Sequence, residues 1–574
     1  MKSCRAVIIS GIVAAFASVL PAAHHKLSRE LLTRDSAQPV DIIVQFKTAP
    51  RKGRHLAHDP HTVFERAVRA VRLKGGALRS GLELVDGAAF TVPASALHDL
   101  AADPDVDYIS PDHQVRATLD YASPAVGADL AMQYGWKGTG IGIAVIDSGI
   151  YDHDDLKDAN CSNSRIVYRQ SFVPNDNGVD DHYGHGTHVA GVLAGNGKCS
   201  DKDKAKVIFR GVAPEAKIIS LRVLDRHGVG KDSTVIAAID KAIALKTKYN
   251  IRVINLSLGR PVYRTYKQDP LNLAVQKAWK AGIVVVVAAG NLGRNNTAGT
   301  QGYATVTAPG NDPHVITVGA MKTLSTLSRG DDLIASYSSK GPTLFDHVVK
   351  PDLVAPGNRV ISLLCQTSDL EKNYNGNEVS FSYHNTGNSG PSGGPSPYYS
   401  RLSGTSMAAP MVSGAVALLL QKTPSLTPDQ VKARLMKTAS KNFPSFSVAT
   451  DPVTGETFQA QYDIFTIGAG YLDINAALNN TDKAALPSLS PTVRFDPASG
   501  TVYLVSDSSA VWGTSAVWGA SAVWGTSVFL AGTSAVWGGS AVWGDSAVWG
   551  DSAVWGTTNQ TSAESTNIII HGEN

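Results

Sequence analysis

Short apolar runs alternate with segments of helical periodicity along the middle of the chain, and this alternation restricts the fold more than any other feature. The first run, residues 140–146, contains no charged residue, as expected of a strand buried on both faces in a parallel sheet. Residues 186–193, 234–246 and 270–281 have helical character between such runs. We therefore predict an α/β fold whose mostly parallel sheet carries helices on both faces. Further strands are predicted at 217–222, 252–258, 283–288 and 315–318.

A separate small unit precedes this region. Residues 38–117 contain three predicted strands and two predicted helices, which gives the unit an α+β character of its own. The strands are predicted at 41–46, 82–92 and 107–110, and the helices at 61–73 and 95–102.

The first 23 residues have the pattern of a secretory signal. The basic residues Lys2 and Arg5 precede an apolar run at 6–20, and small residues follow it. The run is short for a membrane span, although an uncleaved N-terminal anchor stays an alternative. We predict that residues 1–23 are a signal peptide and that the protein is secreted or held at the cell surface.

Export permits disulfide bonds. Loss of Cys4 with the signal leaves Cys161, Cys199 and Cys365, an odd number that allows one internal pair at most. Cys161 and Cys199 bracket residue 185 in flanking loops. The sequence is compatible with a disulfide bond between these two cysteines and equally with two separate thiols.

A six-residue repeat lies in the C-terminal part of the sequence. The sequence Ser-Ala-Val-Trp-Gly begins at residues 509, 515, 521, 534, 540, 546 and 552 and holds seven of the nine tryptophans. Because a step of six is even, an extended chain places the indoles of an in-phase run on one face. We predict a β-rich or disordered Trp-repeat segment at 509–556, preceded by a linker at 480–508 and followed by a tail at 557–574.

Four polar residues stand where predicted strands end or helices begin. Ser406 lies in a Gly-Thr-Ser turn before an apolar helix, where free backbone N–H groups stabilise negative charge. Asp147 and Asn291 follow predicted strands, and His185 lies among small residues that open a helix. Considered alone, each residue is as consistent with a structural role as with a catalytic one. The structural roles are a helix cap, a turn residue or a histidine that supports the fold. Together they supply the hydroxyl, imidazole base, orienting carboxylate and oxyanion donor of nucleophilic acyl transfer.

Three longer motifs contain these residues. Residues 145–149, 185–191 and 404–410 read Val-Ile-Asp-Ser-Gly, His-Gly-Thr-His-Val-Ala-Gly and Gly-Thr-Ser-Met-Ala-Ala-Pro. Their sequences, and their Asp, His, Ser order, resemble those of the subtilisin-like serine proteases. The resemblance covers residues 122–479 as a catalytic domain, and residues 38–117 resemble the family's inhibitory propeptide more weakly. Shorter motifs agree with it at 211–214, 338–343, 351–357 and 470–473.

The resemblance implies a role for each residue. Asp147 would orient His185, which would act as the base. Ser406 would attack the peptide carbonyl, and Asn291 would donate to the oxyanion. The small residues of the primary pocket, Ser257 among them, imply that it accepts a large apolar or aromatic side chain. The implied substrate-binding residues are Gly228, Val229, Gly230, Ser257, Leu258, Gly259, Ala288, Gly290 and Gly302.

The same resemblance makes Asp155 a candidate calcium ligand. Calcium is thus expected as a structural ion, whereas the chemistry itself requires no cofactor. Residues 197–210 do not follow the family's ligand pattern, so a surface carboxylate stays the alternative for Asp155.

The implied protein is a secreted, self-processing serine endopeptidase of broad specificity. Its partners would be polypeptide substrates and its own propeptide as inhibitor, and a net charge of +3 over 574 residues gives no indication of nucleic acid. We interpret the repeat as a module for cell-surface or self-association, so a chain ending at Asn479 is expected to keep hydrolytic activity. The alternative is a surface-associated binding protein with minor catalysis, in which the Trp-repeat segment is the working part.

Two other enzyme classes fit the sequence poorly. An α/β-hydrolase has its catalytic histidine after the serine, and the only histidine after Ser406 is His571 in the tail. A zinc enzyme could use His182, His185 and His188, but these lack the i,i+4 spacing of helical zinc ligands.

Overall fold

The computed structural model divides the chain into two units, Met1–Arg116 and Ala117–Asn574. The predicted signal peptide at 1–23 and the Trp-repeat segment at 509–556 lie outside the described residues. Among the described residues, no helix is long and apolar enough to span a bilayer. The structure describes residues 26–28, 31, 39–47, 65, 68–69, 71–73, 75–82, 87–111, 121–200, 205–295, 300–374, 376–385, 394–451, 455–485, 487–496, 501–505 and 568–573.

The smaller unit is an antiparallel sheet in the order β2-β3-β1-β4. Ile42, Phe90 and Ile109 are fully buried in its core. The region predicted as one strand at 82–92 belongs to two strands, because β2 ends where the prediction begins and β3 starts at Gly87. The elements are β1 (Pro39–Phe46), β2 (Ala77–Leu82), β3 (Gly87–Pro93), η4 (Ala94–Ala96), α2 (Leu97–Ala101) and β4 (Val106–Pro111).

The larger unit is built on an eight-stranded sheet. Its path is β11-β10-β9-β8-β5-β7-β6, and β12 pairs with β10. Every pair is parallel except β10 with β11, which confirms the predicted mostly parallel sheet. The five predicted strands correspond to β5 (Gly142–Asp147), β7 (Lys217–Arg222), β8 (Ile251–Leu256), β9 (Val284–Ala288) and β10 (Ile316–Lys322).

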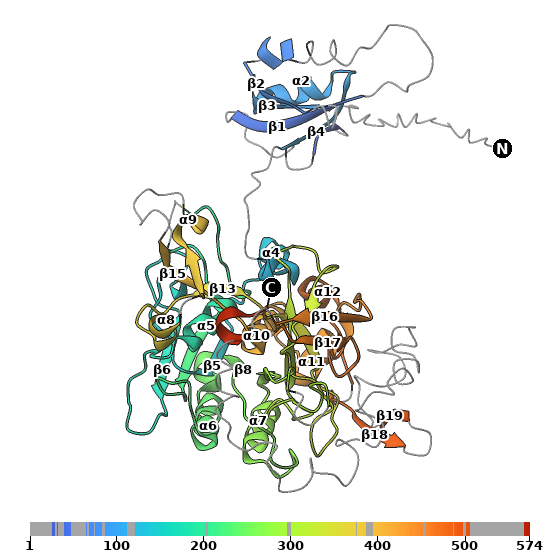
Figure 1. Ribbon diagram of the computed structural model, residues 1–574. Coiled ribbons are helices and arrows are strands. Elements are labelled where there is room, and N and C mark those ends of the chain that lie inside the picture. Colours follow the sequence, from blue (N-terminus) through green and yellow to red (C-terminus); the bar gives the residue numbers. More distant parts are fainter. Residues whose placement is uncertain are drawn as a thin grey trace, which may run out of the picture. The chain divides into compact units, whose positions relative to one another are not determined.

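Helices cover both faces of this sheet (Figure 1). α10 (Thr405–Lys422) packs on β8, β9 and β10 and beside α5 (His185–Ala194). α6 (Asp232–Tyr249) and α7 (Pro270–Lys280) pack together on the other face. Every residue of α10 from Met407 to Leu420 is buried, so this helix has no polar face over that length.

Residues 366–397 are rich in Gly, Ser, Asn and Pro, a composition that predicts a long surface loop. Short elements occupy the described parts of this region. That prediction was wrong in part, because Leu370 and Val379 are buried and hold α8 (Asp369–Asn373) and β14 (Glu378–Ser380) in place. The remaining elements are α3 (Ala122–Ala125), α4 (Ala128–Gln133), η5 (Asp154–Leu156), β6 (Ile166–Ser171), β11 (Leu333–Ile334), β12 (Leu353–Pro356), β13 (Val360–Leu363), α9 (Phe381–His384), β15 (Pro395–Leu402), α11 (Pro428–Thr438), β16 (Phe446–Thr450), β17 (Thr457–Gln461), α12 (Ile474–Asn479), β18 (Thr492–Asp496) and β19 (Thr501–Val505).

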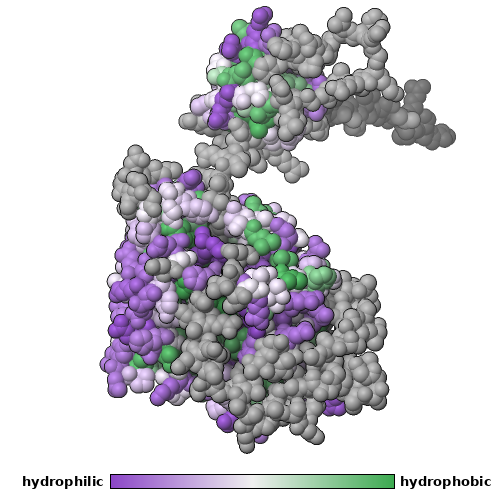
Figure 2. All heavy atoms as spheres, in the orientation of Figure 1, coloured by the Kyte–Doolittle hydropathy of each residue, from purple (hydrophilic) through white to green (hydrophobic). Residues whose placement is uncertain are grey.

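The surface of the larger unit differs from its core. Over β6 and α8 the visible face is mostly hydrophilic in Figure 2. The apolar side chains of the central sheet and of α10 are buried in one continuous cluster. Burial of this apolar area is the main favourable contribution to the stability of such a fold.

The packed core continues beyond Asn479. Lys432 Nζ donates to Ser490 Oγ at 2.8 Å and pairs with Asp352 Oδ1 at 3.1 Å, and all three residues are buried. Ser490 Oγ also donates to Asp352. Because buried charges need their hydrogen-bond partners, a chain ending at Asn479 would leave this cluster incomplete. The structure therefore contradicts the expectation that such a chain keeps its activity. Part of the predicted linker at 480–508 also belongs to the core.

A disulfide joins Cys161 to Cys199, and Cys365 is a free, buried thiol. The pairing that the sequence left open is therefore present in the structure.

We predict one free thiol in the denatured chain once residues 1–23 are gone, and three after reduction. The bridge spans 38 residues of sequence, so replacing both cysteines by serine should lower the free energy of unfolding by about 4 kcal/mol in the chain-entropy model. Thiol titration and denaturant unfolding measure these two quantities. Three thiols before reduction would contradict the pairing.

Candidate active site

Asp147 and His185 meet where β5 ends and α5 begins. His185 Nδ1 lies 2.8 Å from Asp147 Oδ1, and both side chains are buried. Burial is the largest single effect and opposes the charged imidazole, but the carboxylates of Asp147 and, to a lesser extent, Asp181 together outweigh it and raise the pKa of His185 above its ordinary value. The Asp147 carboxylate thus both orients the ring and stabilises its protonated form.

A buried carboxylate that sequence reasoning missed holds the start of α5. Asp181 Oδ1 accepts from Gly184 N at 2.7 Å, and Asp181 Oδ2 accepts from Thr187 N at 2.8 Å. Ser148 Oγ donates to Asp181 Oδ1 at 2.8 Å and accepts from Gly186 N at 2.9 Å. The loop after β5 and the first turn of α5 are therefore fixed to each other. An aspartate four residues before the histidine was the only sequence signal for this arrangement.

Glycine at position 186 allows the two elements to approach closely. A Cβ atom there would lie 2.2 Å from the carbonyl oxygen of Gly149. Any side chain at this position would push α5 away from the end of β5, and the contact between His185 and Asp147 would lengthen.

Ser406 is the second residue of α10 and is partly exposed, whereas its neighbours on both sides are buried. Its Oγ donates to the Ser257 carbonyl at 3.2 Å, and its own carbonyl accepts from Ser257 Oγ at 2.8 Å. Pro410 has no N–H to bond the Ser406 carbonyl along the helix. Ser257 supplies that missing donor, and the end of β8 is thereby tied to the turn.

Asn291 follows β9 and is held against the same turn. Its Oδ1 accepts from Thr405 N at 2.9 Å and from Thr405 Oγ1 at 3.0 Å. A Cβ atom on Gly404 would lie 3.0 Å from Asn291 Nδ2, and Gly404 has φ +145°. With Oδ1 bound to Thr405, the amide N–H group of Asn291 lies beside the Ser406 turn.

Two predicted substrate-binding residues, Gly259 and Gly290, pack against Thr307. A Cβ atom on Gly259 would lie 2.4 Å from Thr307 Oγ1, and one on Gly290 would lie 2.9 Å from Thr307 Cγ2. Thr307 N donates to Ala289 O at 3.0 Å. The structure therefore brings the segments after β8 and β9 together at Thr307.

Other predicted substrate-binding residues contact different parts of the structure. Gly302 packs on the backbone of Gly293, since a Cβ atom there would lie 1.7 Å from the Gly293 carbonyl oxygen. Gly228 lies against the ring of Tyr183, whose centroid is 6.4 Å from that of His185. Val229 is 63% exposed, so a ligand could reach this edge.

The contacts of Asp155 do not fit a calcium ligand. Its Oδ1 accepts from Cys199 N at 2.7 Å and Ser200 N at 2.9 Å, and its Oδ2 accepts from Tyr399 at 2.6 Å. A calcium ligand turns its oxygens to the ion, whereas these oxygens are turned to protein donors. Within the described parts of the chain, no three His, Cys, Asp or Glu residues gather in a way that could hold a metal.

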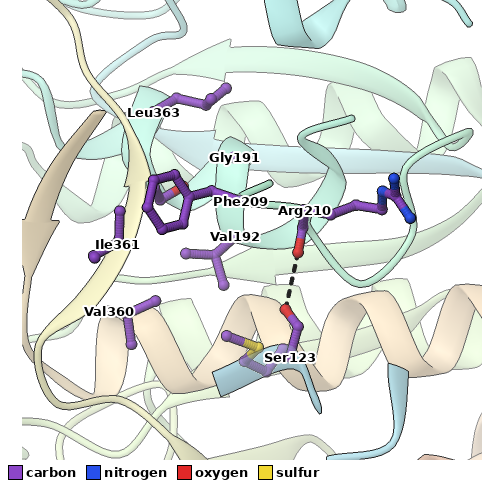
Figure 3. A pocket seen from close by; sticks show the side chains of 10 residues that line it. Ser123, Gly191, Val192, Phe209, Arg210, Val360, Ile361 and Leu363 are labelled. Carbon is purple, nitrogen blue, oxygen red and sulfur yellow. Dashed lines mark hydrogen bonds between the residues drawn. The ribbon is translucent and has the colours of Figure 1, made fainter. Parts of the chain in front are cut away.

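A cavity of about 10 Å³ lies between α5, β13 and α10, at the end of α5 away from His185 (Figure 3). Ser123 Oγ donates to the Arg210 carbonyl at its edge, at 2.9 Å. The cavity has room for about one water molecule. It is too small to bind a substrate.

The comparisons with known proteins agree with this geometry. A model of the subtilase family matches residues 138–465. The serine protease AprX of Bacillus subtilis is 35% identical over 380 residues, which cover 64% of this chain and 77% of that protein. Subtilisin E of the same organism is 34% identical over 372 residues, covering 64% and 79%. Subtilisin DY of Bacillus licheniformis is 35% identical over 330 residues, covering 57% and 94%.

The family match spans more than half of the chain and contains every element that carries the site, from β5 to the start of α10. The chain therefore belongs to the subtilase family and is a serine-type endopeptidase.

Proposed function

We propose that this subtilase is secreted as a proprotein that processes itself, and that Asp147, His185, Ser406 and Asn291 perform its chemistry. One observation carries the proposal: the 2.8 Å contact between His185 Nδ1 and Asp147 Oδ1. It leaves Nε2 of the ring as the nitrogen that can accept a proton.

Attack begins with an exchange of hydrogen bonds. Ser406 Oγ leaves the Ser257 carbonyl and donates to His185 Nε2, which takes its proton as Oγ bonds to the peptide carbonyl carbon. Asp147 stabilises the imidazolium that forms. The imidazolium then protonates the leaving amine, and the neutral ring activates the water that hydrolyses the acyl-enzyme.

The oxyanion meets two donors. The Ser406 backbone N–H lies in the first turn of α10, where helix N–H groups have no partner within the helix. The Asn291 amide is oriented by its bonds to Thr405, so it needs no reorganisation when charge develops. These groups bind the transition state better than the substrate, which is the requirement for raising kcat.

The small residues Ala288 and Gly290, which are expected to line the primary pocket, support a preference for apolar or aromatic side chains. These residues are small, and Leu292 after Asn291 places no charge there to pair with lysine or arginine. Residues 228–230 and 257–259 would hold the substrate backbone as an extended strand. Such main-chain recognition favours broad specificity.

The division of the chain supports the propeptide hypothesis. The smaller unit ends at Arg116 and has its own core, and we expect the mature enzyme to begin just after it, near Ala117 or Thr118. Secretion rests on the pattern of residues 1–23, and surface or self-association rests on the Trp repeat at 509–556. A binding protein with minor catalysis is not favoured, because the four functional side chains are intact.

Replacing Ser406 by alanine should leave an uncleaved proprotein and reduce kcat by about 10⁶, the loss known for the serine of subtilisin. Peptide hydrolysis and the mass of the secreted chain are the measurements. Ser380→Ala removes an exposed hydroxyl on β14 and serves as the matched control, with activity unchanged. Peptide hydrolysis by the Ser406→Ala variant at the normal rate would contradict the mechanism.

The pH profile should report His185. The ring must be neutral to accept a proton, and its pKa is raised from 6.5, so kcat/KM should fall with decreasing pH through a pKa above 6.5. Asp147→Asn removes the carboxylate and leaves burial, which lowers the pKa. The acid limb should therefore move to lower pH while kcat falls about 10⁴-fold. An unmoved limb would contradict the assignment.

The mature enzyme should begin near Ala117 or Thr118. Sequencing the N-terminus of secreted, active protein tests this directly, and the Ser406→Ala chain should still contain residues 38–117. An active enzyme whose first residue lies within 41–92 would reject the propeptide hypothesis.

A further inference from the structure

The last described residues of the chain are packed into the larger unit. Residues 568–571 form one helical turn, drawn in red in Figure 1, and Gly572 and Glu573 follow it. Ile568 and Ile570 are buried in the same apolar cluster as α10. We refer to residues 568–573 as the C-terminal clip.

A buried carboxylate anchors the C-terminal clip. Glu573 Oε1 accepts from Arg294 Nη2 at 2.8 Å, from Ser336 N at 2.9 Å and from the Ser336 hydroxyl. Glu573 Oε2 pairs with Lys322 Nζ at 3.1 Å, and the side chains of both ion-pair partners are less than a tenth exposed. A buried charge is retained only where it is paired and hydrogen-bonded, so this contact is specific for an acidic side chain.

The backbone of the clip is held as closely. Glu573 N donates to Asn358 Oδ1 at 2.8 Å, and Asn358 Nδ2 donates to the Glu573 carbonyl at 2.7 Å. Gly572 has φ +61°, and a Cβ atom there would lie 2.2 Å from Ser403 Oγ. Only glycine fits at this contact.

These contacts reach both loops that carry the proposed chemistry. Ser403 N donates to the Ile569 carbonyl at 2.8 Å, and Ser403 is three residues before Ser406. Arg294, which binds Glu573, is three residues after Asn291. One short segment therefore connects the turn of the nucleophile with the loop of the oxyanion donor.

We propose that the C-terminal clip positions the Ser406 turn against the Asn291 loop, with Glu573 and Gly572 as its positioning residues. The proposal rests on the proposed function, because it assigns the clip to the site of Ser406. Residues 506–567, which include the Trp repeat, connect the clip to β19 in the sequence, yet the clip itself belongs to the protease. Since all its contacts are non-covalent, it should also act as a separate peptide.

A merely stabilising segment would behave differently. Its loss would lower the fraction of folded enzyme, and each remaining folded molecule would turn over normally. A positioning segment changes the rate of each folded molecule, because a displacement of about 1 Å of a reacting group costs about 100-fold in rate. Rates per titrated active site distinguish the two.

The first experiment uses the full chain with Glu573→Gln, which removes the charge, and Gly572→Ala, which pushes on Ser403. Active sites are titrated with a fluorophosphonate, and kcat and KM are measured on a peptide substrate. We expect kcat per active site to fall about 10- to 100-fold in each variant, with KM within two-fold. Glu378→Gln, at an exposed glutamate on β14, is the matched control and should change neither.

The second experiment supplies the clip in trans. A chain ending at residue 566 should have low kcat, and a synthetic peptide of residues 567–574 should restore it saturably. The same peptide with Glu573→Gln should not. If the shortened chain fails to fold, the two point variants decide alone.

Three results would overturn the proposal: unchanged kcat per active site in Glu573→Gln and Gly572→Ala, a shortened chain with normal kcat, or active mature enzyme whose mass shows that residues 568–573 are absent. Labelling the unaltered enzyme distinguishes a failure of the clip proposal from a failure of the proposed function. Label on Ser406 with normal kcat in the variants rejects the clip alone, whereas label on another residue rejects the assignment of the nucleophile.

Discussion

The parallel pairing of β5, β8 and β9 decides where this protein can perform chemistry. These strands are neighbours in the order β9-β8-β5, so the residues after their carboxyl ends meet at one edge of the sheet. Asp147 ends β5, Ser257 follows β8 and Asn291 follows β9. α10 packs across β8, β9 and β10, and its first turn opens at the same edge. Ser406 is therefore positioned by the packing of one apolar helix on an apolar sheet.

Hydrogen bonds at this edge fix the first turns of α10 and α5 in place. Pro410 removes a helical donor and Ser257 replaces it, so a bond that would lie within α10 instead connects α10 to the sheet. Asn291 makes a second connection through Thr405. Asp181 performs the corresponding task for His185 by binding the first turn of α5. Each group that we propose to react is thus held by a neighbouring residue to which we assign no reaction.

Local pattern predicted the strands and helices of the larger unit, and it identified the residues that we propose carry the chemistry. The strand at 217–222 was predicted with the bounds it has, because its composition alone identifies a strand buried on both faces. Contacts between distant residues could not be predicted in this way. Asp155 receives its donors from Cys199 and Tyr399, and Glu573 lies 279 residues from Arg294 along the chain. No periodicity encodes such contacts, so the contacts of Asp155 and the C-terminal clip emerged only from the structure.

The proposed mechanism requires that Ser406 is the nucleophile and that the folded site activates it. Labelling the secreted enzyme with a fluorophosphonate, followed by peptide mapping by mass spectrometry, tests this most directly. We expect one modified residue, Ser406. Its labelling rate should fall as the pH decreases through the pKa of His185, and labelling should be lost when the enzyme is unfolded. Modification of a different serine, or of Ser406 at the same rate in unfolded protein, would contradict the proposed mechanism.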